Sequence, residues 1–451
     1  MNNKLVKAAI AAALLSAACV PAAQAQSADD IAALKAQLEA LQKKVADMEA
    51  AQKAQSEVQD KTLDQVAQQR ANVGEWVGRF QWKGDIRYRN EDIKQEFNPA
   101  ERNRDRIRVR AGLVAKVNDT VKAEVQLTTG ESLASGGYGD ARSPNQTLTD
   151  ANSRKRVWFD TAFFEWAPNA SWKATFGKMR YPWVRPNNAL FFDGDINPEG
   201  VSVGWQQGTD GLFATGFYVD LAERSAAADS TMSGGQFGWR GPLGSSGTRL
   251  TVAATYYDHG AVKGYNAVQD GLLPANAFGN TTTADPTICR PGVLTTTNTA
   301  CIANDFNVIE GLAELTMQVA GKPLIFSADY AKNNKADFVG VSPNKLDTAY
   351  AAGVQFGRVT TAQTWEVAYL YQHVENDALY GQWVDSDFGG GVTGTQGHVF
   401  KVGYGFGRNF RLNGTYFWND TNIDVPTTIA GVGPVTERRY KRLQLDLLAT
   451  F

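Results

Sequence analysis

Cysteine and histidine are scarce in this sequence, with 3 residues of each among 451. His259, His373 and His398 are far apart, and only two cysteines remain once Cys19 is assigned to the leader described below. This argues against a structural zinc site and against a Cys/His catalytic pair. The sequence also contains no His-Glu-x-x-His pair and no phosphate-binding loop. We therefore expect no enzyme, no cofactor and no bound metal.

An excess of one charge sign and long hydrophobic runs are also missing. The chain has 45 Lys and Arg against 47 Asp and Glu, a net charge of −2, so the sequence gives no reason to expect a nucleic-acid partner. Beyond the leader, no stretch reaches the roughly 18 consecutive apolar residues that a membrane-spanning helix needs. Any membrane contact must therefore use strands or the protein surface. What is abundant, 43 Gly with 22 Phe, 15 Tyr and 11 Trp, favours β structure.

Residues 1–25 have the features of an export signal peptide. Lys4 and Lys7 precede an apolar run, and a small-residue cleavage triplet follows at 23–25. The alternative is a lipoprotein signal with a lipid attached to Cys19, but the preceding leucine lies one position too far upstream for a good lipobox. The chain is therefore predicted to leave the cytoplasm.

Residues 26–72 are predicted to form a periplasmic α-helical coiled coil. The segment 27–69 contains neither Gly nor Pro, and its apolar residues recur at the alternating spacings of a heptad pattern: Ile31, Leu34, Leu38, Leu41, Val45 and Met48. About three heptads are few for a stable isolated coil, so a solvated spacer is one interpretation. We favour self-association, because the apolar seam would otherwise face water.

From residue 73 to 451 the helical period is replaced by alternation. In Gly78–Asn90 and in Arg106–Val117, apolar side chains on one face alternate with mostly charged side chains on the other. One such strand alone would suit a half-exposed antiparallel sheet. The number of strands changes this interpretation, because 16 segments qualify. The other fourteen are Val121–Thr129, Arg156–Ala167, Ser171–Arg180, Gly200–Gln207, Gly211–Leu221, Gln236–Leu243, Thr248–Asp258, Phe306–Val319, Leu324–Asn333, Ala349–Gly357, Gln363–Val374, Gly397–Gly405, Phe410–Trp418 and Arg439–Phe451.

The links between these segments alternate between tight turns and long polar connections. Short turns at one rim and long loops at the other are typical of an outer-membrane β-barrel, with apolar residues facing lipid and polar residues lining the lumen. The fold class is therefore all-β and transmembrane: an antiparallel barrel of about 16 strands, preceded by the coiled-coil helix. We expect it in the bacterial outer membrane.

The last strand of the chain ends in an aromatic residue, Phe451. An alternating final strand with a terminal aromatic resembles the recognition signal of proteins inserted into bacterial outer membranes. The resemblance covers about ten residues, and it assigns Phe451 a role in membrane insertion.

The segment Asp193–Gly200, together with the strand count and the final strand, resembles the trimeric porins of Gram-negative bacteria that carry an N-terminal coiled coil. The resemblance implies a homotrimer in outer-membrane lipid and passive diffusion of small hydrophilic solutes or ions. It also implies that the third long loop, Tyr181–Glu199, folds into the barrel as a constriction carrying Asp193, Asp195 and Glu199. The alternative is that Asp193, Asp195 and Asn197 only shape an Asx-rich turn. The spacing of the two aspartates is not that of a known calcium loop.

Charges on the lumen wall should decide the selectivity of such a pore. The first, second and last strands become neighbours on closure, and their inward positions form a basic wall: Lys83, Arg87, Arg89, Arg106, Arg108, Arg110, Arg438 and Arg442. Asp85 and Asp446 share this wall and neutralise part of its charge. An acidic loop across the lumen would create a transverse field. We expect a modest preference for anions.

Cys289 and Cys301 lie in a long Thr/Asn/Pro-rich link, and an exported chain meets an oxidising compartment, so we expect a disulfide; two free thiols are the alternative. For the whole protein, a structural tether or adhesion protein is the alternative to a porin. Lumen width separates the two, because about 16 strands leave an aqueous channel whereas about eight are filled by side chains.

Overall fold

The structure is a computed structural model. It describes residues 28–98, 100–132, 139–149, 151–245, 247–266, 277–296, 298–337, 342, 344–429 and 432–451. The predicted signal peptide at 1–25 lies outside these residues. The chain divides into two compact units, residues 1–78 and residues 79–451.

The first unit contains one long helix, α2 (Ala28–Gly78), of 51 residues. It extends six residues beyond the predicted boundary at residue 72. The seam residues Leu38, Leu41, Val45 and Met48 are all exposed on the single chain, at 58%, 67%, 41% and 57% of their accessible surface. No helix among the described residues is long and apolar enough to cross a membrane.

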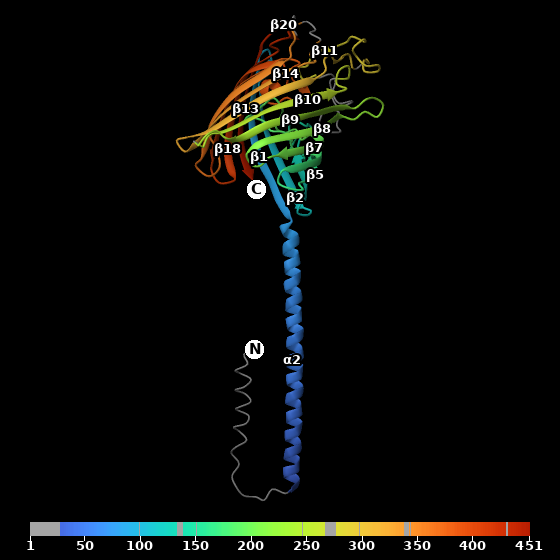
Figure 1. Ribbon diagram of the computed structural model, residues 1–451, viewed down its shortest axis with the longest axis vertical. Helices are drawn as coiled ribbons and strands as arrows, with labels where there is room; N and C mark the ends of the chain where they lie inside the picture. Colours follow the sequence, from blue (N-terminus) through green and yellow to red (C-terminus); the bar gives the residue numbers. More distant parts are fainter. Residues whose placement is uncertain are drawn as a thin grey trace. The chain divides into compact units, whose positions relative to one another are not determined.

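The second unit is a closed antiparallel barrel of 16 strands (Figure 1). Each strand pairs with the next along the chain, and β1 also pairs with β21, which closes the barrel. The strands are β1 (Phe80–Gln95), β2 (Arg102–Lys116), β3 (Val121–Thr129), β5 (Val157–Trp166), β6 (Trp172–Lys178), β7 (Glu199–Gln206), β8 (Gly211–Ala222), β9 (Ser230–Pro242), β10 (Arg249–Gly260), β13 (Asn307–Val319), β14 (Lys322–Asn333), β15 (Thr348–Gly357), β16 (Trp365–Val374), β17 (Thr395–Gly405), β18 (Phe410–Thr421) and β21 (Arg438–Thr450).

Smaller elements lie in the long loops. β4 (Gln146–Thr147) pairs with β2 beyond the end of β3. Two short hairpins form, one from β11 (Thr282–Thr283) with β12 (Cys301–Ile302) and one from β19 (Thr427–Ile429) with β20 (Gly433–Val435). Two single-turn 3₁₀ helices, η1 (Gly381–Trp383) and η2 (Phe388–Gly390), lie in the loop between β16 and β17.

The barrel and its strand count confirm the sequence prediction. All sixteen predicted segments correspond in order to the sixteen strands, and β3 has the predicted bounds. The largest differences are at β1, which continues to Gln95 rather than Asn90, and at β9, which begins at Ser230 rather than Gln236. The sequence pattern missed both extensions because their outward positions are not apolar. They are Asp92 and Lys94 on β1, and Thr231, Ser233 and Gly235 on β9.

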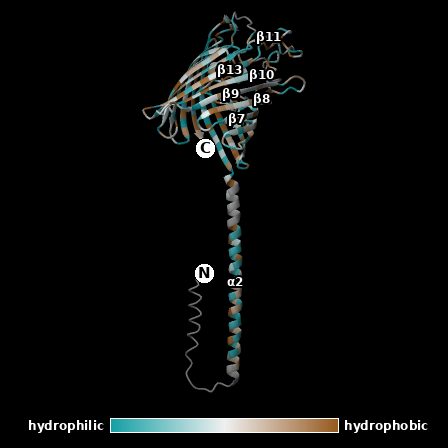
Figure 2. Ribbon diagram, viewed as in Figure 1, coloured by the Kyte–Doolittle hydropathy of each residue, from teal (hydrophilic) through white to brown (hydrophobic). Residues whose placement is uncertain are grey.

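The two faces of the wall differ as the alternation requires. On β1, Trp82, Ile86 and Tyr88 are exposed on the outside at 74%, 47% and 43%, whereas Arg89 and Glu91, on the opposite face of the strand, are buried inside. Hydrophobic and hydrophilic residues accordingly alternate along the strands in Figure 2.

One rim of the barrel has tight turns whose geometry is set by asparagine. The side-chain oxygen of Asn118 accepts hydrogen bonds from the backbone amides of Thr120 and Val121 at 2.9 and 2.8 Å. Asn169 accepts in the same way from Ser171 and Trp172. Such Asx turns reverse the chain within a few residues. The opposite rim carries the long loops, three of which reach into the barrel.

The seam that closes the barrel depends on a glycine. Gly84 and Phe451 exchange two backbone hydrogen bonds of 2.9 and 3.0 Å. A Cβ atom on Gly84 would lie 2.6 Å from the Phe451 ring and 2.4 Å from the carbonyl oxygen of Arg110. Only glycine therefore leaves room for the terminal aromatic ring against β1.

Candidate functional site

The lumen wall formed by β1, β2 and β21 is lined with ion pairs. Six of the eight predicted basic residues contact a carboxylate: Lys83 contacts Glu124, Arg89 contacts Asp446, Arg106 contacts Glu91, Arg108 contacts Asp85, Arg110 contacts Asp160, and Arg442 contacts Glu91. The N···O distances run from 2.5 to 3.4 Å. The structure thus brings these side chains together on one wall, and it neutralises them more fully than Asp85 and Asp446 alone could.

Glu91 is the centre of this network, and the sequence analysis did not assign it. Its side chain is fully buried and contacts Arg104 at 2.8 Å, Arg442 at 2.8 Å and Arg106 at 3.4 Å. The predicted first strand ended at Asn90, one residue too early to include it. Glu91 follows Arg87 and Arg89 at a spacing of two residues, which places all three on one face of the strand. This spacing was the available signal.

Two predicted wall residues differ from the others. Arg87 donates from Nη2 to the amide oxygen of Asn145 at 2.6 Å, and no carboxylate among the described residues lies within salt-bridge distance. Arg438 donates from Nε to the backbone oxygen of Glu96 at 2.6 Å, at an exposed position. Because Arg438 is the first residue of β21, it belongs to the rim of the barrel rather than to the wall at mid-height.

The loop between β6 and β7 (residues 179–198) crosses the inside of the barrel. It bonds to inward side chains of strands far apart around the wall: Gln236 of β9 accepts from the Val184 amide, Glu314 of β13 accepts from the Asn187 amide, and Gln355 of β15 accepts from the Asn188 side chain. Lys401 of β17 donates to Asn188 at 3.2 Å. These bonds fix the loop across the lumen.

The acidic residues of this loop are placed differently from the expectation of a transverse field. Asp195 contacts Arg110 at 2.9 Å and Arg108 at 3.7 Å, so its charge lies against the basic wall rather than across the lumen from it. Asp193 instead accepts hydrogen bonds from the amides of Asp195 and Ser386, each at 2.8 Å. Glu199 is the first residue of β7 and pairs with Lys178 at 2.7 Å, because the chain has already rejoined the barrel wall there.

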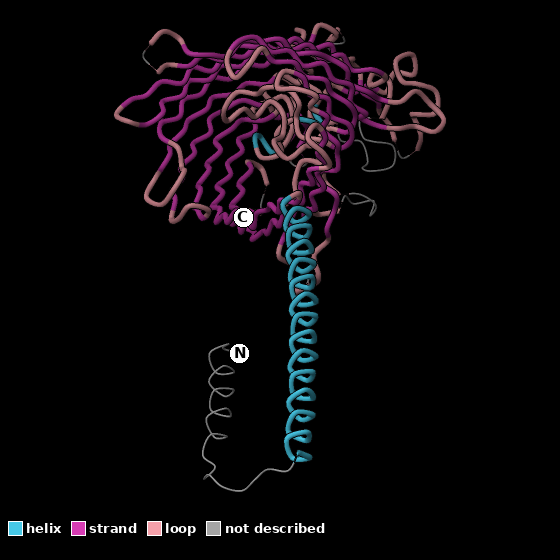
Figure 3. The backbone as a smooth tube through the Cα atoms, turned by 60° about the horizontal axis from the view of Figure 1, so that its bottom comes forward, coloured by secondary structure: helices cyan, strands magenta, loops and turns pink. Residues whose placement is uncertain are grey.

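A second loop, residues 375–394 between β16 and β17, also folds inward, and the sequence analysis did not predict it. The Asp193 amide donates to the carbonyl of Trp383 at 2.8 Å, and Arg142 of the β3–β5 loop donates to the carbonyl of Gly391 at 2.8 Å. Asp387 contacts Arg442 at 2.8 Å and Arg89 at 3.2 Å. Figure 3 shows loop segments and short helical turns within the ring of strands. Three loops therefore meet inside the barrel.

The interior also contains a buried apolar cluster. Aromatic residues of the β6–β7 loop pack on inward residues of the strands, with Trp183 4.4 Å from Phe217 and Phe192 5.4 Å from Tyr257, centroid to centroid. Leu379, Val384 and Phe388 of the second inward loop belong to the same buried cluster. This cluster anchors both loops to the wall formed by β8–β10 and β13–β18.

Burial and neighbouring charges shift the pKa values of the loop aspartates in opposite directions. Burial, and then the Asp385 carboxylate, raise the pKa of Asp193 well above its usual range. Burial also opposes the ionisation of Asp387, but the guanidinium groups of Arg442 and Arg89 outweigh it and lower the pKa. Among the described residues, no group of three or more His, Cys, Asp or Glu side chains is placed to hold a metal ion.

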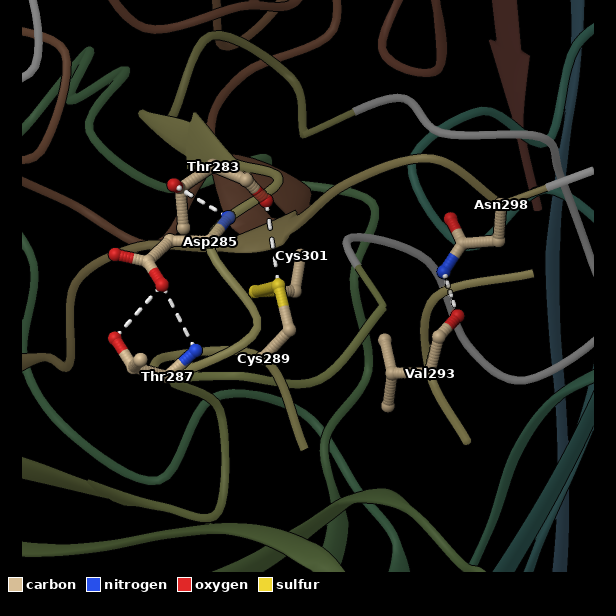
Figure 4. Close-up of a disulfide and its surroundings, with 7 residues drawn as sticks. All are labelled: Thr283, Asp285, Thr287, Cys289, Val293, Asn298 and Cys301. Carbon is tan, nitrogen blue, oxygen red and sulfur yellow. Dashed lines mark hydrogen bonds between the residues drawn. A yellow bond between two sulfur atoms is a disulfide. The ribbon is translucent and has the colours of Figure 1, made fainter. Parts of the chain in front are cut away.

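The long loop between β10 and β13 contains the disulfide Cys289–Cys301, with Cα atoms 5.6 Å apart (Figure 4). Asp285 caps the turn before Cys289 by accepting from the amide and hydroxyl of Thr287 at 2.8 and 2.7 Å. The same loop meets the second inward loop, because Asn280 donates to the carbonyls of Asn376 and Leu379 at 2.7 and 2.8 Å.

A cavity of about 450 Å³ lies on the turn side of the β6–β7 loop. Pro182 and Val184 of the loop line it together with inward residues of the wall, among them Gln206, Thr215 and Arg240. The guanidinium of Arg240 lies over the ring of Phe213 at 5.0 Å and donates to Gln206 at 2.9 Å. This is free space inside the barrel next to the inward loop.

Comparison with known families agrees with this geometry. Residues 95–432 match the model of a family described as "Putative porin". The chain belongs to this porin family. No curated protein matches the sequence.

Several solved bacterial porins are similar to this chain in structure. Pseudomonas putida OprB, in a structure at high pH, has 10% identity and a TM-score of 0.51, over 84% of this chain and 96% of its own. Vibrio cholerae OmpT in its trimer form has 12% identity and a TM-score of 0.44, over 82% and 99%. Salmonella typhi OmpF in complex with daunomycin has 10% identity and a TM-score of 0.45, over 82% and 97%. The family match and the closed barrel together make this protein an outer-membrane porin that forms a channel.

Proposed function

We propose that this porin lets small hydrophilic solutes and ions diffuse passively past a constriction made by the β6–β7 loop. The observation that carries this proposal is the set of bonds from Val184, Asn187 and Asn188 to strands β9, β13 and β15. A loop fixed at several points of the wall narrows a 16-stranded lumen without filling it.

The test is single-channel recording of the purified porin in a planar bilayer. We expect steady conductance at rest, and a complete lack of conductance at every voltage would contradict the proposal. Asn187→Ala with Asn188→Ala removes bonds from the loop tip and should raise the conductance or its fluctuations. Asn118→Ala is a matched control, because it changes an asparagine of a rim turn and should leave the conductance unchanged.

The lumen should favour anions modestly. The arginines are fixed to the wall by strand pairing, but nearly all contact carboxylates, so only a small positive excess reaches the solution. The zero-current potential in a potassium chloride gradient measures this preference. Clear cation selectivity would mean that the loop aspartates outweigh the wall.

The helix α2 is the basis for a proposed homotrimer. A chain of 51 helical residues extends about 77 Å at about 1.5 Å per residue, and its exposed Leu38, Leu41 and Met48 need an apolar partner. A second and third copy of the same seam provide one, on the periplasmic side of the membrane.

Deleting residues 27–69 tests the role of the helix. We expect an inserted, conducting barrel whose oligomer dissociates at a lower temperature in seminative electrophoresis. An oligomer of unchanged heat resistance would contradict the role of the coil and leave the barrel unaffected.

A further inference from the structure

Arg87 is the one mid-height arginine of the basic wall without a carboxylate partner among the described residues. Its neighbours on both sides are neutralised: Arg89 by Asp446 at 2.6 Å, and Arg108 by Asp85 at 2.8 Å. The protein contact of Arg87 is the neutral amide of Asn145. A positive charge therefore remains on the lumen wall at this position.

The neighbouring groups make the electrostatic potential at Arg87 more positive. In the β1–β2 register Arg87 stands directly opposite Arg108, a like-charge cross-strand pair that is unfavourable unless an anion screens it. Asp195, the nearest loop acid to this pair, is already bound by Arg108 and Arg110. Among the described residues no carboxylate lies within salt-bridge distance of Arg87, so an anion from the solution can add compensation there.

The guanidinium itself is incompletely bonded. Nη2 donates to Asn145, whereas Nε is buried and has no hydrogen-bond acceptor among the described residues. The side chain as a whole is only partly buried, so solution ions can approach its exposed part. An arginine that is held by one bond to a neutral group and still has unused donors is suited to a planar, two-oxygen anion.

We propose that Arg87 is a docking position for small anions bearing a carboxylate or phosphate group, and that it carries the anion preference of the pore. This inference rests on the proposed function. The other arginines of the wall act mainly as partners of buried carboxylates. Asn145 is a positioning residue, because its amide oxygen accepts a hydrogen bond from the guanidinium at 2.6 Å.

The experiment measures inhibition of chloride current through the full-length porin by potassium acetate and by inorganic phosphate, together with the zero-current potential. In the unaltered porin both anions should reduce the chloride current in a saturable way. In Arg87→Gln the inhibition constants should rise about tenfold or more, as for loss of a charge-assisted hydrogen bond, and the zero-current potential should shift toward cations. A response to phosphate but not acetate would assign the position to phosphate-bearing solutes.

Two variants separate this position from a general effect of charge. Lys122→Gln removes the same formal charge from a lysine that pairs with Glu165 at 2.7 Å near the turn rim, and it should change neither readout. Arg87→Lys keeps the charge without the planar fork, so it should restore the zero-current potential but not the full inhibition by phosphate.

The outcomes are distinguishable from failure of the proposed function. If the unaltered protein does not conduct, the channel proposal is wrong. If it conducts and Arg87→Gln has the same inhibition constants and zero-current potential, the assignment of Arg87 is wrong. An equal shift in Lys122→Gln would likewise overturn it, because total charge rather than position would then decide.

Discussion

The two sides of the barrel interior are built from different chemistry. On β1, β2 and β21 most of the inward arginines are bound to carboxylates, with Glu91 at the centre. On β8–β10 and β13–β17 they include Phe217, Tyr257 and Val399, which are buried beneath the inward loops. One side contacts the inward loops through ion pairs, and the other packs against them through apolar side chains.

From this difference we infer that the apolar side holds the loop that narrows the lumen, while the charged side sets the selectivity. Apolar packing holds the β6–β7 loop by many small contacts, which are insensitive to salt. Ion pairs hold the charged wall in a fixed geometry, and a buried pair responds strongly when one partner is lost. Substitutions on the two sides should therefore have different signatures.

Glu91→Ala should have the largest effect. It leaves Arg104, Arg106 and Arg442 without a shared carboxylate in a buried position, so we expect the free energy of unfolding to fall by about 5 kcal/mol. Urea titration of the folded porin in lipid vesicles measures it. The control is Glu101→Ala, which removes the exposed partner of Lys94 and should change stability by less than about 1 kcal/mol. Equal effects would mean that the buried network does not hold the wall together.

Phe192→Ala tests the apolar side. The ring is 5% exposed and packs on Tyr257, so its loss should destabilise the porin by about 3 kcal/mol and release part of the β6–β7 loop. Unlike Glu91→Ala, it should raise single-channel conductance without moving the zero-current potential. A change in selectivity of similar size in both variants would contradict the different roles of the two sides.

Val109→Lys tests the register on which the charged side depends. Val109 stands opposite Ile86, an outward residue with 47% of its surface exposed, so the new ammonium would face lipid. We expect a loss of about 2–3 kcal/mol and reduced insertion into vesicles. If the lysine altered selectivity but not assembly, the inward and outward faces of β2 would be exchanged, and the residues assigned to its lumen face would be wrong.

The sequence predicts the charged side of the lumen better than the apolar side. Where Arg87 and Arg89 alternate with Ile86 and Tyr88, charge separates the two faces, and the inward set follows from a period of two. On β8 apolar residues occur on both faces, since Tyr218 is exposed outside and Phe217 buried inside. Alternation then still predicts a strand, but it cannot reveal what covers the inner face.

The local sequence pattern could not predict where the loops lie in the barrel. The inward position of Asp195 follows from contacts with Arg108 and Arg110, which are about 85 residues away in the chain. The fold of residues 375–394 depends on Trp383 and Asp387 meeting groups on other loops and strands. These contacts form only when the barrel has folded, and no periodic pattern in the loop sequence predicts them.

The smallest predicted effect is a pH dependence at the junction of the two inward loops. Burial, and then the neighbouring Asp387 carboxylate, raise the pKa of Asp385 from 3.8 to about 6. Between these values the folded porin binds more protons than the unfolded chain, so this group's contribution to the free energy of unfolding falls as the pH rises. Asp387 has a lowered pKa, and its opposite contribution is lost only at more acidic pH.

Asp385→Asn should therefore flatten the stability profile between about pH 4 and pH 6, measured by urea titration, and reduce any rise in current fluctuations over the same range. The variant keeps a side-chain oxygen that can accept from the amides of Asp387 and Phe388, as the native carboxylate does at 3.0 and 2.9 Å. Glu223→Gln, on the β8–β9 loop, is the control for removing one loop carboxylate. If the variant and the unaltered porin had the same slope, the carboxyl group would titrate in its ordinary range, and the junction would be held by backbone and apolar contacts alone.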